Sequence, residues 1–583
     1  MTPTTKDRLQ LAIQHHSAGR LAEAEAIHRQ ILVEHPNEAD ALHLLGYLIH
    51  QSRRDPSALD LVRRAIAIEP RAFQYHNTFG LILLDRGQAP AAAEAFRRAI
   101  QINPGVSDAH NNLGSALQAQ NQFDQAIAAY REAVRLKPDL ASAHFNIGSA
   151  LTAKGDLPSA AAALRDTLRI DPRLARAHNN LGYVLYLQNL LDEAIAAFQQ
   201  AVAHEPNYSA AWNNLGLAYR SNDQPEQAAD AFGRAVALNP SYADAESNWG
   251  LALADLGRSD EAIAHQRRAI SLRPDFARAH WALSQLLLQR DEYEEGFSHW
   301  DWRLKIPELG LKMSFSQPMW DGGNITGRRI VLITEQGAGD AIQFARFIPL
   351  VAERGGHVLL ACKQPLARLL QTAPGVKETF VEGQTIPAAD LYCPLESLPK
   401  VFGTTFQTIP PRTPYLSVDS GEAERWKLRI PADRLKVGLV WSGKTIPNPK
   451  RSIPLSQLAP LGEIANIWWL SLQTGDAASQ AASSPFPLTN WSDELKDFAA
   501  TAALMSQLDL IITIDTAVAH LAGAIGKRVW VMLPFVADWR WGLGRENCPW
   551  YPSMRLFRQP AAGDWTSVVR QVKAALASFR GGV

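Results

Sequence analysis

The first half of the chain alternates short helix-like segments with polar turns. One unit begins with AHNNLGSALQAQ (109–120), passes through a polar turn at 121–124, and continues with QAIAAYREAVRL (125–136). Pro138 follows two residues later and has no N–H with which to continue a helix. The pattern predicts two helices joined by a tight turn.

This unit recurs every 34 residues over residues 5–274. Proline, glycine and alanine mark the period, the glycine and alanine where the paired helices approach closely. The markers are Pro36, Pro70, Pro104, Pro138, Pro172, Pro206, Pro240 and Pro274; Gly46, Gly80, Gly114, Gly148, Gly182, Gly216 and Gly250; and Ala24, Ala58, Ala92, Ala126, Ala160, Ala194, Ala228 and Ala262. Such a period is typical of tetratricopeptide repeats, which bury their apolar faces only by stacking. We expect an α-solenoid of these repeats over residues 5–290, with eight repeats and a divergent ninth pair in which Ser284 replaces the glycine.

A row of asparagines keeps the same period, two residues before the repeat glycine. Its members are Asn112, Asn146, Asn180, Asn214 and Asn248. Two residues correspond to about 200° of helical rotation, which points these side chains away from the second helix and toward the inner groove. An amide donates and accepts hydrogen bonds, so the row could hold the backbone of an extended acceptor peptide, or it could bridge adjacent repeats. The row resembles the one that lines the repeats of the O-linked N-acetylglucosamine transferases, which favours peptide binding.

From about residue 313 the pattern changes to short buried strands alternating with helices. The strand 329–335 leads through the glycine turn QGAGD (336–340) into the helix-like AIQFARFIPLVAERG (341–355), as in a doubly wound α/β domain. We expect further strands at 357–361, 391–393, 436–441, 467–472, 508–514 and 528–533, and further helices at 422–428 and 491–509. The expected domains after the solenoid are a divergent last helix and linker at 291–327 and two Rossmann-like halves at 328–430 and 431–583.

Two motifs in this half resemble a known family. GAGDAIQFARFIPL (337–350) and IITIDTAVAHLAGAIGKRVWVML (511–533) are similar to the glycine–aspartate turn and the Asp-Thr…His segment of the bacterial lipopolysaccharide heptosyltransferases. The resemblance implies a GT-B glycosyltransferase that is inverting, uses a nucleotide-sugar donor, and needs neither a metal ion nor a cofactor. The fusion to tetratricopeptide repeats also resembles the bacterial flagellin glycosyltransferases.

The glycine turn carries the candidate catalytic residue, Asp340. It follows Gly337 and Gly339 and opens a helix, where a carboxylate could take the proton of an attacking acceptor hydroxyl. It matches the aspartate for which the family proposes this role. A carboxylate in the first helical turn can also serve only as a cap.

The second motif carries the candidate donor site. Asp515 and Thr516 follow a strand and open a helix, whose free N–H groups suit a phosphate. His520 is four residues after Thr516 and shares its helix face, so a hydroxyl and an imidazole could both reach phosphate oxygens. We assign Asp515 to capping or to sugar hydroxyls; for His520 a structural role is the alternative.

A basic loop, WSGKTIPNPKRSIPL (441–455), lies between the two motifs. Lys444 and Arg451 could stabilise the charge of a departing nucleotide, or the loop could simply be solvated. The heptosyltransferases carry a lysine where this chain has Arg451, so the resemblance does not identify the donor.

The amino-acid composition limits the classes of partner that we expect. The 583 residues contain 58 Lys and Arg against 58 Asp and Glu, which gives no overall field for nucleic acid. The three cysteines show no metal-ligand spacing, and neither a signal-like N-terminus nor an 18-residue apolar run is present, so we expect a cytoplasmic protein without a membrane segment. The leading hypothesis is an enzyme that transfers sugar from a nucleotide sugar to Ser or Thr hydroxyls of a protein, possibly flagellin, held by the repeats. The alternatives are a lipopolysaccharide glycosyltransferase and a non-catalytic adaptor.

Overall fold

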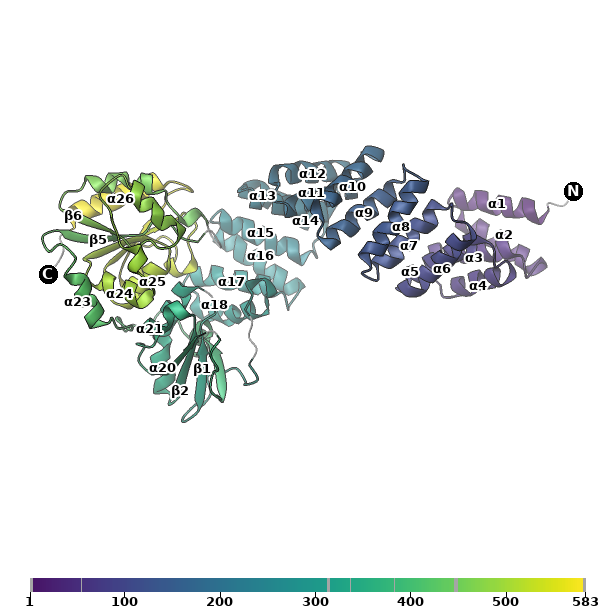
Figure 1. Ribbon diagram of the computed structural model, residues 1–583. Coiled ribbons are helices and arrows are strands. Elements are labelled where there is room, and N and C mark those ends of the chain that lie inside the picture. The colour runs from purple at the N-terminus through teal and green to yellow at the C-terminus, as the bar shows by residue number, and fades with distance from the viewer. Residues whose placement is uncertain are drawn as a thin grey trace. The chain divides into compact units, whose positions relative to one another are not determined.

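The computed structural model describes residues 4–53, 55–311, 315–335, 337–381, 383–444 and 449–579. The chain divides into two compact units, Met1–Pro240 and Ser241–Val583 (Figure 1).

The first unit is a stack of helix pairs. Its helices are α1 (Thr5–Ser17), α2 (Leu21–Glu34), α3 (Ala39–Arg53), α4 (Ser57–Ile68), α5 (Phe73–Asp85), α6 (Ala89–Ile102), α7 (Ser107–Gln118), α8 (Phe123–Leu136), α9 (Ala141–Lys154), α10 (Leu157–Ile170), α11 (Ala175–Leu187), α12 (Leu191–His204), α13 (Ser209–Ser221) and α14 (Pro225–Leu238). The expected close approach occurs at the repeat glycine: a Cβ on Gly114 would lie 2.5 Å from the ring of Tyr130, and one on Gly182 would lie 2.8 Å from that of Phe198. The helical solenoid predicted from the 34-residue period is confirmed.

The repeat proline has a second role that the period alone did not indicate. Its carbonyl accepts a hydrogen bond from the side chain six residues later, in the next helix. The His110 ring nitrogen lies 3.1 Å from the Pro104 oxygen, and Trp212 Nε1 donates to the Pro206 oxygen at 2.9 Å. Such bonds tie the next helix to the preceding pair at six of the repeat prolines, namely Pro70, Pro104, Pro138, Pro172, Pro206 and Pro274.

The second unit begins with two further pairs, α15 (Ala243–Asp255) with α16 (Ser259–Leu272) and α17 (Ala277–Gln289) with α18 (Tyr293–Trp300). In the first pair Gly250 faces the buried Gln266, whose amide donates to the Ser247 carbonyl and accepts from the Ser247 hydroxyl, both at 2.8 Å. In the second pair the buried Ser284 hydroxyl donates to the carbonyl of Gly296 at 2.6 Å. Polar contacts thus replace the contact between glycine and an apolar side chain that the earlier repeats make.

A four-stranded parallel sheet follows, in the order β3-β2-β1-β4. Its elements and those that follow it are β1 (Arg329–Ile333), α19 (Ala338–Phe344), α20 (Ile348–Glu353), β2 (His357–Cys362), α21 (Ala367–Leu370), β3 (Val376–Val381), β4 (Leu391–Pro394), α22 (Leu398–Val401) and α23 (Ser420–Lys427). α18 shares one apolar core with this sheet, through Phe297 and Trp300 among others. The segment predicted as divergent helix and linker therefore starts inside the core of the α/β part.

The last sheet has seven strands in the order β10-β11-β9-β8-β5-β6-β7, and only the β10–β11 pair is antiparallel. Its elements are β5 (Leu435–Leu439), β6 (Ile467–Ser471), β7 (Thr489–Asn490), α24 (Phe498–Ser506), β8 (Leu510–Ile514), α25 (Ala517–Ala524), β9 (Val529–Leu533), β10 (Asn547–Cys548), β11 (Tyr551–Arg558) and α26 (Trp565–Ser578). Numbered along the chain, the six parallel strands follow the order 3-2-1-4-5-6. Such a sheet binds ligands where the order reverses, here between the carboxyl ends of β5 and β8.

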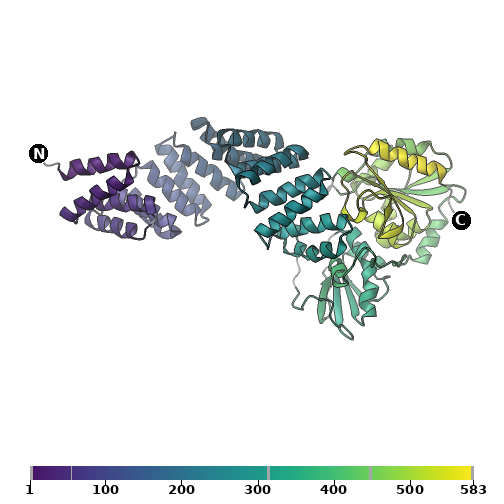
Figure 2. The same cartoon turned by 180° about the vertical axis from the view of Figure 1, so that it is seen from behind.

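Helices lie on both faces of this sheet, with α26 on one side and α24 and α25 on the other (Figures 1 and 2). The predicted helix at 491–509 is wrong in length, because only Phe498–Ser506 is helical and the Asp497 side chain caps its start. Within the described ranges no helix has both the length and the apolar character needed to cross a membrane.

Candidate functional site

Three segments from distant parts of the second unit converge beside the β5–β8 switch point: the first turn of α19, the first turns of α25, and the loop after β9. α19 and α25 touch at Gly339, where a Cβ would lie 2.8 Å from His520 Cδ2 and 3.5 Å from Ala517 Cα. A side chain at residue 339 would push the two helices apart, so the glycine permits the approach. The two motifs found in the sequence therefore meet in space.

Asp340 lies in this contact with both carboxylate oxygens engaged. Oδ2 accepts a hydrogen bond from the Gly337 N–H at 3.0 Å, which is the capping contact that the sequence allowed. Oδ1 accepts from Arg540 Nη2 at 2.5 Å, and one fifth of the Asp340 side chain remains exposed. The candidate base is thus fixed in place by one partner from its own turn and one from 200 residues away.

Arg540 was not singled out by the sequence analysis. It is buried in the short 3₁₀ turn Trp539–Trp541, and its guanidinium also donates to Asp538 Oδ1 at 2.8 Å and to Gln343 Oε1 at 2.5 Å. Burial lowers the pKa of Arg540, but Asp538 and Asp340 outweigh it and the net shift is upward. A permanently charged guanidinium therefore joins the first motif to the loop after β9.

Asp515 belongs to the same charged cluster. Removal from water raises its pKa to about 6, with Asp538 adding to the shift and Arg451 and Arg540 opposing it. Asp515 and Arg451, both predicted from the sequence, are therefore close enough to interact electrostatically. Asp515 also interacts with Arg540, the residue that is paired with Asp340.

Arg451 and Thr516, the residue before α25, both approach Gly443 closely. A Cβ on Gly443 would lie 2.9 Å from Arg451 Nε and 3.4 Å from Thr516 Cγ2. Arg451 Nη2 donates to the Lys444 carbonyl at 3.0 Å, while its buried Nε has no hydrogen-bond acceptor in the described part of the chain. The Lys444 side chain is exposed, and residues 445–448 of the predicted loop lie outside the described residues.

Thr516 and His520 differ in what surrounds them. Thr516 is half-buried at the start of α25, with its hydroxyl 3.2 Å from that of Thr513. His520 is buried beneath Gly339, with Nδ1 3.1 Å from the Tyr551 hydroxyl and its ring stacked on Trp541 at 5.2 Å. Burial lowers the pKa of His520 well below its usual value, so the ring is neutral near pH 7. Its contact with phosphate stays a prediction.

Behind Asp340 lies a second charged group that the sequence analysis missed. Arg303, from the turn after α18, donates to Glu335 Oε1 at 2.5 Å and to Asp301 Oδ1 at 3.0 Å, and its Nε lies 3.8 Å from Glu396 Oε2. The side chains of Arg303, Glu335 and Glu396 are all buried. Burial raises the pKa of Glu396 well above its usual value, Asp340 adds to this, and Arg303 opposes it.

The asparagine row uses its amides between repeats. Asn112 Nδ2 donates to Asn77 Oδ1 at 3.1 Å, Asn146 Nδ2 to Asn111 Oδ1 at 3.0 Å, and Asn214 Nδ2 to Asn179 Oδ1 at 3.0 Å. Asn180 donates to the Ser149 hydroxyl at 3.4 Å, and Asn248 lies half-buried on α15. Bridging, the alternative role, thus occupies one N–H in each of the first four and leaves their second N–H for other contacts. Peptide binding by the row stays a prediction.

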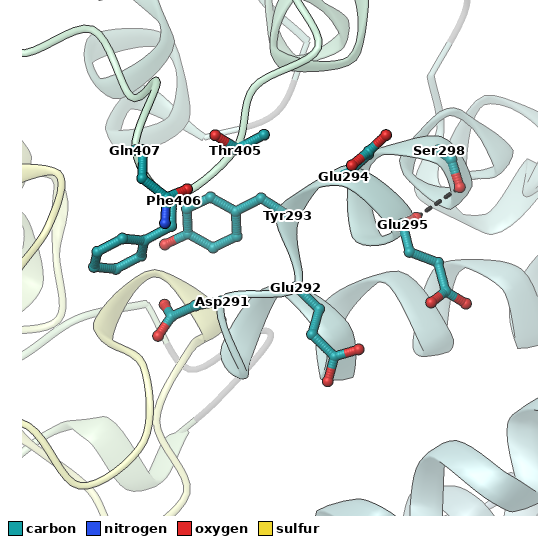
Figure 3. A pocket seen from close by; sticks show the side chains of 9 residues that line it. All are labelled: Asp291, Glu292, Tyr293, Glu294, Glu295, Ser298, Thr405, Phe406 and Gln407. Carbon is teal, nitrogen blue, oxygen red and sulfur yellow. Dashed lines mark hydrogen bonds between the residues drawn. The ribbon is translucent and has the colours of Figure 1, made fainter.

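A pocket of about 690 Å³ lies where the start of α18 meets the loop at 405–407 (Figure 3). The Phe406 ring lies beside Tyr293, with ring centroids 6.2 Å apart. Three acidic residues of its lining are paired elsewhere, Asp291 with Arg545, Glu292 with Arg290 and Glu295 with Arg267. None of the residues predicted from the sequence lines this pocket.

Comparison with known proteins identifies the repeats. Family models described as tetratricopeptide repeat match residues 9–73, 77–141, 111–175, 145–210 and 247–298, and another matches 209–242. Tetratricopeptide repeats therefore extend across residues 9–298.

The chain is also similar to the protein FlbA of Caulobacter vibrioides, with 29% identity over 331 residues. The match covers 51% of this chain and 54% of FlbA, so the chain spans about half the length of this relative. Among solved structures it is similar to the APC/C hetero-tetramer Cut9–Hcn1, with 22% identity, a TM-score of 0.37 and coverage of 46% of this chain and 52% of that one. It is likewise similar to YrrB, a repeat protein with an unusual peptide-binding site, with 26% identity, a TM-score of 0.29 and coverage of 32% and 96%.

Proposed function

We propose that this protein is an inverting glycosyltransferase of the GT-B type that moves a sugar from a nucleotide-sugar donor to Ser or Thr hydroxyls of a protein bound by the repeats. The observation that carries the proposal is the meeting of the two heptosyltransferase-like motifs, at Gly339 and His520, beside the switch point of a doubly wound sheet. The two motifs are about 175 residues apart in sequence, and an assembled site gives a reason for both to be present.

In this proposal the donor diphosphate lies at the start of α25. The N–H groups of its first turn, the Thr516 hydroxyl and the guanidinium of Arg451, whose Nε has no acceptor within the described ranges, supply donors for phosphate oxygens. Lys444, exposed on the neighbouring loop, adds a positive charge as the nucleotide departs. His520, neutral and buried, holds α25 against α19 and thereby fixes the distance from donor to base.

Asp340 takes the proton of the acceptor hydroxyl as its oxygen attacks the anomeric carbon. One fifth of its side chain is exposed, which leaves a path for a hydroxyl to reach it. Each Asp340 oxygen accepts one hydrogen bond and keeps a second lone pair, which can take the proton. Arg540 and the Gly337 N–H orient the carboxylate in the meantime.

The repeats supply the acceptor. Asn112, Asn146 and Asn214 each retain one amide N–H and a carbonyl beyond the bridging N–H, and these groups can pair with the main chain of an extended peptide whatever its sequence. A flagellin-like protein is the first acceptor to test, following the resemblance of the fusion to flagellin glycosyltransferases.

The test is transfer by the full chain. The protein is incubated with a panel of UDP-, GDP-, ADP- and CMP-sugars and with flagellin from the source cell, and intact-mass spectrometry follows the acceptor. A mass increase of one sugar with the wild type and none with Asp340→Asn supports the proposal. Absence of transfer, together with absence of nucleotide-sugar binding by calorimetry, refutes it.

A non-catalytic adaptor is the second candidate. The ion pair that occupies Asp340 and the burial of His520 favour it, because both residues already have structural partners. Binding of the acceptor protein with no binding of any nucleotide sugar would select the adaptor.

A further inference from the structure

We propose that Arg303, delivered by the segment that ends the last repeat, is a positioning residue for Asp340, and that this last repeat is part of the catalytic half rather than a detachable binding module. The inference rests on the proposed function for what Asp340 does. The positioning itself rests on contacts within the second unit.

The first set of contacts reaches Asp340 from its own sheet. Glu335 follows β1 and stands two residues before Gly337, and Glu396 follows β4, the strand that pairs with β1. Both carboxylates therefore lie at the sheet edge from which the Gly337–Asp340 turn departs. Arg303 binds the first at 2.5 Å and lies 3.8 Å from the second.

Charge explains why this arginine is needed. Asp340, Glu335 and Glu396 interact with one another, and burial together with that interaction raises the pKa of both glutamates. Arg303 opposes both shifts. Loss of one member of a buried ionic group leaves charge unbalanced in a poorly solvated place, and the usual result is rearrangement of the local chain. The chain that would move here is the end of β1 and the turn that bears Asp340.

The second set of contacts reaches Asp340 through Arg540. α18 places the Phe297 and Trp300 rings edge-on against Trp539, with centroids 5.9 and 5.7 Å apart, and Trp539 directly precedes Arg540. Gln289 at the end of α17 donates to the Ala537 carbonyl at 3.0 Å. The Arg540 turn is thus packed against the same helix pair.

One helix pair with its following turn therefore supports both members of the Asp340–Arg540 pair, one through buried charge and one through packed aromatic rings. Residues that belong to two different sheets are held at a fixed separation by a repeat. A catalytic carboxylate displaced by about 1 Å can lose about two orders of magnitude in rate, so this support has a direct effect on turnover.

The experiment compares Arg303→Met with Arg303→Met/Glu335→Gln/Glu396→Gln in the full chain. The triple variant removes the guanidinium together with the two carboxyl groups that it contacts. Arg278→Met is the matched control, because Arg278 forms an exposed ion pair with Glu308 in the same segment. Three quantities are measured: amide hydrogen exchange of residues 337–344, the donor dissociation constant, and the turnover number for transfer.

For Arg303→Met we expect exchange of 337–344 to accelerate and turnover to fall, each by about tenfold or more, with the donor dissociation constant within about threefold of wild type. The triple variant should recover most of both losses, and the control should change neither. If Arg303→Met does not fold, Arg303→Lys replaces it, since it retains the charge but not the planar fork, and the same accelerated exchange and slower turnover are expected.

Unchanged exchange and turnover in a folded Arg303 variant overturn the proposal, as does loss of exchange protection spread evenly over the whole unit. The exchange measurement needs no substrate. Accelerated exchange at 337–344 in a protein whose wild type transfers no sugar would therefore refute the proposed function and leave the positioning role of Arg303 standing.

Discussion

The repeats of the first unit and the α/β part of the second are built from contacts of very different range. In the repeats, Asn112 bonds to Asn77, 35 residues earlier, and the same bond recurs one period later. In the α/β part, the Lys436 N–H donates to Asp509 across 73 residues, and Arg540 reaches Asp340 across 200. The first region repeats the same local contact in successive repeats, whereas the second depends on long-range contacts that each occur once.

Because of this difference, substitutions should act differently in the two regions. In a repeat array, each unit contacts its neighbours and a substitution acts mainly there. At the candidate site, the Arg540 guanidinium touches residues of two segments, α19 and the loop after β9, so substitutions in either are coupled and their effects do not add. The variants below separate the holding of a protein from the chemistry performed on it.

The largest effect is expected from Asp340→Asn. The amide keeps the shape of the side chain but cannot accept a proton at neutral pH, so turnover for sugar transfer should fall by about 10²–10⁴-fold. Donor and acceptor dissociation constants, measured by calorimetry, should change little. Asp433→Asn, which removes an exposed carboxylate, is the control. Near-normal turnover by the folded Asn variant would return Asp340 to a purely structural role.

The next effect concerns donor binding. Replacing Thr516 and His520 together with Ala should raise the donor dissociation constant at least about tenfold. The lost Thr516 bond to a charged phosphate is worth about 1.5–3 kcal/mol, and loss of the buried His520 ring removes the contact that holds α25 against α19. Acceptor binding to the repeats should not change. Since His520 is buried beneath Gly339, Thr516→Ala alone serves as the variant with intact packing. A lower melting temperature for His520→Ala with an unchanged donor titration would assign that histidine to packing.

A smaller effect is expected in the repeats. Replacing Asn146, Asn180 and Asn214 with Ala removes amides worth about 0.5–1.5 kcal/mol each, so acceptor affinity should fall by about tenfold. Donor binding should stay as in the wild type. The control removes an exposed ion pair of the same unit, Arg165 with Glu193. Unchanged acceptor binding with lower stability of the first unit would mean that the row only bridges repeats.

The smallest effect is a pH-dependent change in stability. The pKa of Glu396 is raised in the folded protein, so its contribution is fully present below the unfolded value near 4.5 and is lost as pH rises through the folded pKa. Glu396→Gln mimics the neutral acid and should melt a few degrees higher than wild type at pH 8, with the difference shrinking toward pH 4. The groups facing Glu396 are Asp340, Glu335, Arg303 and Arg540. An equal difference at both pH values would show that the carboxyl is not neutral in the fold.

The sequence predicted what is local or periodic. The helix pairs follow from the 34-residue period, and the strands at 329–333 and 510–514 follow from short apolar runs that end in turns. The polar run 491–497 was assigned to a helix because its composition allows one, whereas the Asp497 side chain caps the helix only at Phe498. β11 carries only a weak strand signal, because buried and exposed residues alternate only over Met554, Arg555 and Leu556.

The candidate site was only half visible in the sequence. Asp340 and Thr516 were found because each lies in a motif that resembles a family. Arg540 lies in a tryptophan-rich loop with no motif, and its position depends on packing against residues 200 positions away. The sequence likewise gave no sign that Arg303 and Glu396 lie at the site, because a buried charged residue can be recognised only when its partner is known. Both arginines directly follow an Asp-Trp pair, in Asp301-Trp302-Arg303 and Asp538-Trp539-Arg540, and this is a signal that they share.

The polar contact between Ser247 and Gln266 lies within one helix pair, so its two partners are inherited together. Before residue 241, the repeat glycine instead faces an apolar side chain of its own pair, such as Tyr130 or Phe198. Gln266 is matched to both the hydroxyl and the carbonyl of Ser247. An apolar side chain introduced at residue 266 alone would leave both Ser247 groups without these partners. A swap of the whole helix pair would carry both partners along, so the pair, and not the single residue, is the unit that can be exchanged here.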